Sequence, residues 1–317
     1  MISFIRPSVL RRRGILGMNR RNIGVIGEYN PRRNYPLVDN KLKTKRAAQA
    51  NNIPVPELYG RVDYQHQVAG VIDQLAAHDS FVIKPAQGSG GKGILVITGR
   101  SGDSYIKSSG QKVDAAEIRR HVTNILAGLH SLGGRNDYAM IEALIDFDPV
   151  LANYSYEGVP DIRVIAFKGV PVMAMMRCAT HASDGKANLH QGAVGVGIDI
   201  ATGRSVRAVQ HEMLVAAHPD TGACFHTLQL PHWGRVLDLA ASCVEMTGLG
   251  YLGADIVLDR EQGPMLLELN ARPGLAIQVA NQAGLQHRLE RAEQIAAQTG
   301  DHDRKIELAR RDFAAAP

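Results

Sequence analysis

The sequence predicts a soluble α+β protein, and three observations support this class. Alanine-rich stretches that suit helices are separated by short apolar runs that suit strands. Two strand pairs, 161–167 with 170–176 and 253–258 with 265–270, are each joined by a short turn, as in a hairpin. With 45% hydrophobic and 21% charged residues, the 317-residue chain can bury a core and is not disordered. It lacks the run of about 18 apolar residues that a membrane span needs.

The helices are expected from their composition and from the residues that end them. In the first, Leu42, Arg46 and Ala50 share one face, and the prolines at 54 and 56 prevent the helix from continuing. In the second, the apolar residues recur at helical spacing. The expected helices are 40–52, 65–78, 115–132, 237–247 and a charged stretch from 286 onward.

The remaining strands are short apolar runs bounded by glycine, proline or polar residues. Besides the two hairpins, they are 22–27, 81–84, 94–97 and 138–145. The segment 180–197 is long and polar and has too few apolar residues to form core. Loops of this length within a compact domain are usually functional, so we expect a functional loop here.

Charge is distributed unevenly along the chain. Residues 1–46 contain 12 Lys and Arg and two acidic residues, a net charge of +10, whereas the remaining residues carry −5. We expect a basic arm that is solvated or faces substrate. Nucleic acid is not the expected partner, because no aromatic-rich surface or DNA-binding motif accompanies the arm. The three cysteines show no metal spacing and the N-terminal apolar stretches are too short for a signal peptide, so a cytoplasmic protein is expected.

A glycine-rich loop, 88–93, lies between two expected strands. A dinucleotide fingerprint would open a helix, a Walker loop would contain GK[ST], and a kinase would place its lysine after the loop, so none of these applies. Glycines allow backbone N–H groups to approach phosphate oxygens, and Lys84 and Lys92 add positive charge. The loop is therefore either a phosphate-binding loop or a plain surface turn.

Acidic and amide side chains gather on the last expected hairpin. Glu268 and Asn270 are two residues apart on one strand and share a face, and Asp255 lies on the other strand. Acids on otherwise apolar strands are costly unless compensated, and three oxygen ligands suit Mg²⁺ held together with phosphates. The alternative is a pair of edge-strand carboxylates that face water.

Together these motifs resemble the ATP-grasp carboxylate–amine ligases, and within them the RimK-like alpha-L-glutamate ligases. The resemblance covers roughly 37–285 and is carried by eight motifs in the expected order. They are Asp39-Asn40-Lys41, Phe81-Val82-Ile83-Lys84-Pro85, the glycine loop, Ile141-Glu142-Ala143-Leu144, Asp161-Ile162-Arg163, Asn188-Leu189-His190, Asp255 and Glu268-Leu269-Asn270-Ala271-Arg272-Pro273-Gly274.

The resemblance implies an ATP-grasp fold, in which two α/β subdomains sandwich ATP, here with a shortened N-terminal region. It implies residues 1–40 as a basic arm, 41–145 as the subdomain with the glycine loop, 146–285 as the subdomain with the Mg²⁺ site and 286–317 as a helical tail. The usual N-terminal domain has no room before Lys41. Part of the substrate surface would then come from the arm, a second subunit or another protein.

The resemblance also implies roles for individual residues. It places ATP phosphates near Lys41, Lys84 and the loop, adenine near Glu142 and ribose near Asp161. Asp255, Glu268 and Asn270 match the ligands of two Mg²⁺ ions, for which Mn²⁺ can substitute, with Glu268 between them. The full set of nucleotide-binding residues is Lys41, Lys84, Gly88, Ser89, Gly90, Gly91, Lys92, Gly93, Glu142, Ala143, Leu144, Asp161, Lys186, Asn188 and His190.

The reaction that follows from the resemblance is amide formation. A carboxylate attacks ATP to give an acylphosphate, and an amine then displaces phosphate. Arg163 and Arg177 would neutralise charge during phosphoryl transfer and Arg272 would hold the substrate carboxylate, although each arginine can instead form a structural ion pair. Amino acids or peptides are the expected substrates. A kinase that phosphorylates a hydroxyl and a non-catalytic nucleotide sensor are the alternatives.

Overall fold

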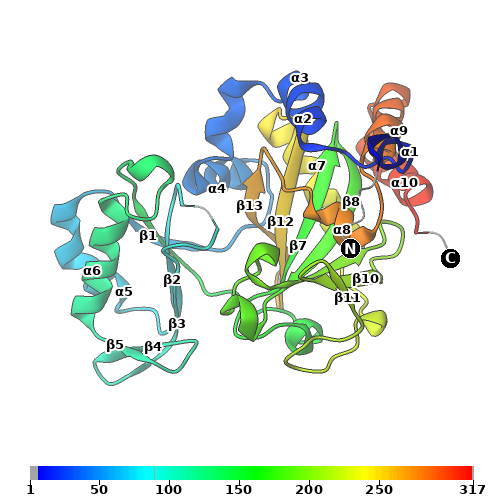
Figure 1. The fold of residues 1–317 in the computed structure, drawn as a ribbon. Coiled ribbons are helices and arrows are strands. Elements are labelled where there is room, and N and C mark those ends of the chain that lie inside the picture. The colour runs from blue at the N-terminus through cyan, green and yellow to red at the C-terminus, as the bar shows by residue number, and fades with distance from the viewer. Residues whose placement is uncertain (1–5, 89, 316–317) are drawn as a thin grey trace. The chain divides into compact units, whose positions relative to one another are not determined.

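The computed structural model describes residues 6–88 and 90–315 and divides into two compact units. Unit 1 comprises 1–39, 46–54 and 147–317, and unit 2 comprises 40–45 and 55–146. Figure 1 shows the ribbon of both. Each unit is built on its own antiparallel sheet with helices packed against it. The chain is therefore an α+β protein.

Unit 2 contains a six-stranded sheet in the order β1-β6-β2-β3-β4-β5. The strands are β1 (Leu58–Val62), β2 (Phe81–Pro85), β3 (Leu95–Ser101), β4 (Ser104–Lys107), β5 (Lys112–Val113) and β6 (Ala139–Glu142). The helical segments are η3 (Gln65–Gly70), α5 (Val71–Leu75), α6 (Ala115–Leu126) and η4 (Leu132–Gly134). The expected pair of strands around the glycine loop is confirmed, because β2 and β3 are antiparallel neighbours.

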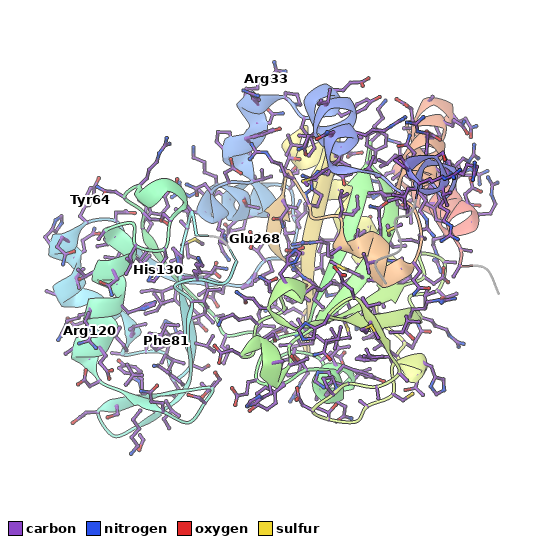
Figure 2. The ribbon with its side chains drawn as sticks, in the orientation of Figure 1. Arg33, Tyr64, Phe81, Arg120, His130 and Glu268 are labelled. Atoms are coloured by element: carbon purple, nitrogen blue, oxygen red, sulfur yellow. The ribbon has the colours of Figure 1, made fainter. Side chains whose placement is uncertain are left out.

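The core of unit 2 lies between the sheet and α6. Phe81 of β2 and Ile118 and Ile125 of α6 are fully buried there, and Figure 2 shows Phe81 between the two elements. Asp114 and Glu117 begin α6 with a reciprocal capping box, in which each side chain accepts a hydrogen bond from the other's backbone N–H. This helix supports β2, the strand that carries Lys84.

Unit 1 contains a seven-stranded sheet in the order β11-β10-β9-β8-β7-β12-β13. The strands are β7 (Asp161–Phe167), β8 (Val170–Cys178), β9 (Val194–Ile198), β10 (Ser205–Gln210), β11 (Met213–Val215), β12 (Tyr251–Asp259) and β13 (Gly263–Asn270). Both predicted hairpins are confirmed, since β7 pairs with β8 and β12 with β13. The two hairpins are neighbours through β7 and β12.

Helices pack against this sheet. α10 contacts both α7 and α9, and these three pack on β7, β8 and β12, whereas α8 packs on β8, β9 and β10 (Figure 1). Their bounds are α7 (Trp233–Thr247), α8 (Ala276–Asn281), α9 (Gln286–Gln298) and α10 (His302–Asp312). Short helical turns connect the strands: η5 (Pro149–Tyr154), η6 (His181–Ser183), η7 (Leu189–Gln191) and η8 (Phe225–Thr227). No helix in the described part of the chain has the length and apolar character that a membrane crossing requires.

The N-terminal segment differs from the prediction. Residues 22–27 were expected to form a strand but lie in helical turns. The segment runs through α1 (Pro7–Arg12), α2 (Met18–Arg20), η1 (Arg21–Ile26), α3 (Gly27–Tyr29) and η2 (Arg32–Leu37). The prediction failed because a short apolar run interrupted by glycine does not distinguish a strand from a helical turn. In the structure Val25 and Ile26 are buried, while Ile23 is 77% exposed.

Two further expectations need correction. The polar segment 180–197 does not stay outside the core, because its end forms β9, a central and fully buried strand. In α4 (Lys41–Ala50), the helix expected at 40–52, the face with Arg46 and Ala50 is exposed. The buried face instead contains Leu42, Lys45 and Ala48. Lys45 is therefore buried, and a buried lysine needs a negatively charged partner.

Candidate functional site

The predicted site residues form a separate charged cluster in each unit. In unit 2 the cluster consists of Lys45, Lys84 and Glu142, here called the lysine–glutamate cluster. Lys84 Nζ lies 2.5 Å from one carboxylate oxygen of Glu142, and Lys45 Nζ lies 2.8 Å from the other. The second contact is an ion pair rather than a well-directed hydrogen bond. All three side chains are at most 8% exposed.

Strand register explains how this cluster forms. Glu142 lies opposite Val82 on the neighbouring strand, so Lys84, two residues further on, projects from the same face of the sheet. Burial alone would raise the pKa of Glu142, but the two ammonium groups outweigh it and lower that pKa. Burial lowers the pKa of Lys45 more than Glu142 raises it. With both lysines charged, the cluster carries a net charge of +1 in a largely desolvated place.

The glycine loop is attached to unit 2 at both ends. At one end Gly88 makes a bridge to Ser131. At the other end His121 hydrogen-bonds to the carbonyl of Gly93 at 3.0 Å, and a side chain at position 93 would meet the ring of His130. Gly93 also has a φ of +74°, a conformation that favours glycine. The loop ends are thus positioned by the backbone and by two histidines.

Other predicted nucleotide-binding residues surround this loop. Lys41 Nζ donates a hydrogen bond of 2.7 Å to the carbonyl of Gly88. Gly90 and Gly91 both have positive φ, and Lys92 is exposed. Ser89 lies outside the described residues. A side chain at Gly90 or Gly91 would meet open space, so glycine there is explained by its positive φ, a conformation that phosphate-binding loops use.

The remaining residues predicted in unit 2 follow Glu142. Ala143 donates its backbone N–H to the carbonyl of Glu57 at 2.9 Å, and Leu144 is half-buried. The chain leaves the sheet here, where β6 ends. These two residues remain predicted as adenine neighbours through their backbone.

In unit 1 the cluster consists of two arginines and two aspartates, here called the arginine–aspartate cluster: Asp161, Arg163, Arg177 and Asp255. Arg163 holds Asp255 with two parallel hydrogen bonds, of 2.7 and 2.6 Å. Arg177 holds Asp161 in the same way, at 2.5 and 2.6 Å, and also donates to Asp255 at 2.9 Å. Bidentate pairs of this kind are strong and directional.

The order of the strands produces this arrangement. Arg177 lies opposite Asp161 across β8 and β7, and Arg163 lies opposite Asp255 across β7 and β12. Glu268 lies opposite Asp255 across β12 and β13. Because paired residues share a face, a row of charged side chains crosses four neighbouring strands.

The charges in this row affect one another's ionisation. Burial would raise the pKa of Asp255, but the guanidinium groups of Arg163 and Arg177 outweigh it and lower that pKa to about 2. For Asp161 the balance is reversed: burial, joined by the negative charge of Asp255, outweighs Arg177 and raises the pKa to about 6. Asp255 therefore stays ionised at neutral pH.

The set of donor atoms suits a hard cation such as Mg²⁺. Asp255, Glu268 and Asn270 offer carboxylate and amide oxygens from one face, and Glu268 and Asn270 are half-buried rather than enclosed. Asp255 is already occupied, because one of its oxygens accepts from Arg163, Arg177 and Asn270. A cation that binds Asp255 must share it with these donors.

The other predicted residues of unit 1 lie in loops. Lys186 pairs with Asp184 at 2.8 Å on the surface. The side chain of Asn188 accepts a hydrogen bond from the backbone N–H of His190 and so begins η7, and the His190 side chain is exposed. Arg272 lies over the ring of Tyr35, with 5.0 Å from the guanidinium carbon to the ring centroid.

The sequence did not identify Lys45, because a lysine within a charged helix usually faces water. A signal was present: Lys45 follows Leu42 by three residues and so shares its buried face. Nor did the sequence identify His211 and Glu212, which line a pocket described below.

Comparisons with known proteins agree with this fold. Solved structures that match include the ATP-grasp ligase PsnB complexed with a minimal precursor (14% identity, 85% of this chain, 63% of that chain, TM-score 0.47). D-cycloserine synthetase DcsG also matches (17%, 83%, 71%, TM-score 0.43), as does the D-alanine-D-alanine ligase from Coxiella burnetii (13%, 88%, 59%, TM-score 0.46). The chain thus spans 63% of the length of PsnB, and likeness at this level carries no argument about activity.

No curated protein matches the chain. A family model described as "Sugar-transfer associated ATP-grasp" matches residues 20–294. The predicted ATP-grasp fold is confirmed, while the RimK-like branch stays a prediction. The chain belongs to the sugar-transfer-associated ATP-grasp family.

Proposed function

We propose that the chain is an ATP- and Mg²⁺-dependent ligase that joins a carboxylate to an amine. In the proposed reaction the carboxylate oxygen takes the γ-phosphoryl group of ATP, which leaves ADP and an acylphosphate. The amine then attacks the acyl carbon, forms an amide and releases phosphate. Membership of an ATP-grasp family supports the use of ATP. The substrates we propose are amino acids or peptides, as for the RimK-like glutamate ligases that the sequence resembles.

The observation that carries this proposal is the row of charges across β8, β7, β12 and β13. It offers carboxylate and amide oxygens for a cation at one end and guanidinium groups next to them. Phosphoryl transfer needs mainly positioning and neutralisation of charge, and such a row supplies both.

The lysine–glutamate cluster supports the same proposal from unit 2. Two ammonium groups share one carboxylate, so the cluster lacks one negative charge. A phosphate group would supply it, and we propose that Lys84, Lys41 and the glycine loop bind the phosphates of ATP. Glu142 holds Lys84 in place, and Ala143 and Leu144 contribute backbone to the adenine site.

Asp255, Glu268 and Asn270 would hold Mg²⁺, for which Mn²⁺ can substitute. When bound, the metal neutralises charge on the phosphoryl group that is transferred. Arg163 and Arg177 keep Asp255 ionised and oriented. Arg272 would hold the substrate carboxylate, and in the structure its guanidinium lies over the ring of Tyr35.

A kinase is the second candidate, and the description of the family favours it. Sugar-bearing molecules are rich in hydroxyl groups, and a hydroxyl that attacked ATP would give a stable phosphoester in place of an amide. The same charged row would serve that reaction. Only the acceptor and the product distinguish the two candidates.

The test is to incubate the chain with ATP, Mg²⁺ and pairs of carboxylates and amines, and to measure ADP release and product mass. A ligase releases ADP and phosphate and gives a product lighter by one water than its two substrates together. A stable phosphoester would exclude the ligase in favour of the kinase, and no ADP release with any pair would indicate a sensor.

The matched variants are Glu268→Gln and Glu261→Gln, which change acids at opposite ends of the same hairpin. Glu268→Gln removes one negative charge from the metal site at nearly constant volume and should abolish ADP release. Glu261, exposed in the turn, should be dispensable. Normal turnover in Glu268→Gln would refute the assignment of the metal site.

A further inference from the structure

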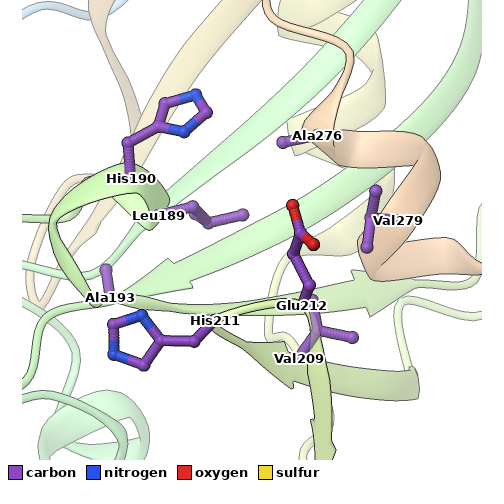
Figure 3. Close-up of a pocket in the computed structure, with 8 residues that line it drawn as sticks. All are labelled: Leu189, His190, Ala193, Val209, His211, Glu212, Ala276 and Val279. Carbon is purple, nitrogen blue, oxygen red and sulfur yellow. The ribbon is translucent and has the colours of Figure 1, made fainter. Parts of the chain in front are cut away.

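A pocket of about 270 Å³ lies in unit 1, apart from the charged row. Figure 3 shows it between η7, the hairpin of β10 and β11, and the first turn of α8. It is lined by Leu189, His190, Ala193, Val209, His211, Glu212, Ala276 and Val279. Five of these residues are aliphatic and none is Lys or Arg. The pocket therefore offers an apolar wall and one full charge, which is negative.

That charge belongs to Glu212, whose side chain projects between Leu189 and Val279 (Figure 3). No hydrogen bond or ion pair joins its carboxylate to another residue within 6–88 or 90–315. The rings of His190 and His211 point away from the centre of the pocket in the same view. Glu212 is exposed, so its carboxylate is open to solvent, and beside the apolar wall it is complementary to a cationic group.

The backbone that presents Glu212 is strained. His211 and Glu212 form the two-residue turn between β10 and β11, with φ of 48° and 65°. A turn with positive φ at both positions favours Asn-Gly, because other side chains disfavour this conformation. Strained residues of this kind cluster at binding sites. We therefore attribute the presence of Glu212 in this turn to binding rather than to stability.

The apolar wall also contains an unexplained side chain. Val279 lies on α8 and is 44% exposed, although it belongs to a helix that packs on the sheet. Together with Leu189 and Val209 it would cover the body of an apolar ligand. The wall and the carboxylate therefore select a molecule with an apolar body and a cationic end.

We propose that this pocket binds a primary amine with an apolar body, with its ammonium group on Glu212. In its role as the acceptor amine this inference rests on the proposed ligase function. The chain supports the connection: Leu189 directly follows Asn188, a predicted nucleotide neighbour, and Ala276 follows Asn270 by six residues. Amine binding itself can be measured without any nucleotide.

The test uses calorimetry on the full chain with 2-phenylethylamine as the probe and 2-phenylethanol as its uncharged counterpart. The wild-type chain should bind the amine at least tenfold more tightly than the alcohol. Glu212→Gln should reduce this preference to about twofold or less, while Glu261→Gln should leave it intact. Equal binding of amine and alcohol by the wild type, or an unchanged preference in Glu212→Gln, would overturn the proposal.

Two further measurements complete the test. Glu212→Gly removes the side chain and relieves the turn, so its loss of preference cannot be ascribed to misfolding. Val279→Ser should weaken the binding of the amine and of the alcohol by the same factor, because it alters the apolar wall and not the charge. If the amine binds as proposed but no pair of substrates releases ADP, the proposed amine pocket is supported and the proposed ligase function is refuted. If ADP release with amines is unaffected by Glu212→Gln, the acceptor role of the pocket falls.

Discussion

Glu142 carries one negative charge but contacts two ammonium groups. The sequence indicated Lys84 and Glu142 separately, because each belongs to a motif on a strand. Their contact could not be predicted, since it depends on which strands are neighbours and on the two-residue offset across β2 and β6. Lys45 enters the cluster from a helix, and no local pattern connects it to that sheet.

Glu142→Gln should destabilise the protein by about 3–5 kcal/mol at neutral pH, because two buried ammonium groups lose their only carboxylate. The pKa of Glu142 is lower in the folded protein than its ordinary value of 4.5. The stabilisation is therefore complete above pH 4.5 and is lost as the pH falls through the lower folded value. Urea unfolding at pH 7, 5 and 3 checks this.

The comparison with Glu57→Gln separates this effect from a general response to acid. Glu57 is exposed in the same unit, so its replacement should change the unfolding free energy little at any pH. The difference between Glu142→Gln and wild type should narrow only below pH 4.5. A constant difference down to pH 3 would contradict the assignment of the ion pairs.

Asp255 and Glu268 are both predicted metal ligands and lie on neighbouring strands. Alternation along β13 predicted only that Glu268 and Asn270 share a face, whereas the place of Asp255 opposite Glu268 follows from the register of β12 and β13. The arginines that hold Asp255 come from β7 and β8, which follow other parts of the sequence. The sequence therefore could not predict that Asp255, besides being a candidate metal ligand, also pairs with two arginines.

Asp255→Asn should abolish ATP turnover and also lower stability by about 3–5 kcal/mol, because Arg163 loses its buried carboxylate. Glu268→Gln should abolish turnover with a change in stability below about 1 kcal/mol, because the Glu268 side chain is half-buried whereas that of Asp255 is buried. Urea unfolding beside an ADP assay distinguishes the two. Equal stability losses would show that the arginine–aspartate cluster does not depend on Asp255.

At the scale of elements, glycines explain both a success and a failure of prediction. The loop 88–93 was expected between two strands, and β2 and β3 flank it. The strand β9 was mistaken for loop because it reads Val-Gly-Val-Gly-Ile. Gly195 and Gly197 allow Leu189 and α8 to approach the sheet, since a side chain at either position would collide with them. Here glycine indicates close packing rather than a turn.

Gly93→Ala should destabilise unit 2 by about 1–3 kcal/mol and weaken nucleotide binding. The added methyl group would lie 2.5 Å from the ring of His130, and the φ of +74° disfavours alanine. His130→Ala in the same chain should restore part of the loss, because it removes the ring contacts and leaves the contact of 2.8 Å with Cβ of residue 130 and the backbone strain. Thermal unfolding with and without ATP and Mg²⁺ checks both.

The turn between β10 and β11 leads to the opposite expectation. His211→Asn with Glu212→Gly should raise the unfolding free energy by about 1–2 kcal/mol, because these residues accept positive φ more readily. The same variant should no longer prefer amines to alcohols. Thermal unfolding measures the first effect, and a lower melting temperature than wild type would contradict the strain assigned to this turn.

For the whole molecule, composition indicated a basic N-terminal arm and correctly located its charge. It did not show that the segment is part of unit 1. Asn30 bonds through its side chain to the backbone of Tyr251 and Ala271, and Gln278 bonds to the backbone of Leu16, which is buried. Neutral side chains make these buried contacts, so charge patterning could not predict them; Arg20 and Arg21 add an exposed ion pair to Glu290 and a hydrogen bond to the carbonyl of Pro273.

Deletion of residues 1–39 should therefore destabilise unit 1 rather than merely remove a solvated arm. The loss of buried Leu16 and of the hydrogen bonds of Asn30 and Gln278 amounts to about 3–5 kcal/mol, or roughly 10 °C in melting temperature. Because the buried contacts are apolar or neutral and the ion pair of Arg20 with Glu290 is exposed, 0.5 M salt should leave most of the difference unchanged, whereas attachment mainly through charge would weaken with screening. If the truncated chain melted at the same temperature as the full chain, residues 1–39 would be a solvated arm after all. If the difference in melting temperature disappeared in 0.5 M salt, the arginines would be what attaches the segment.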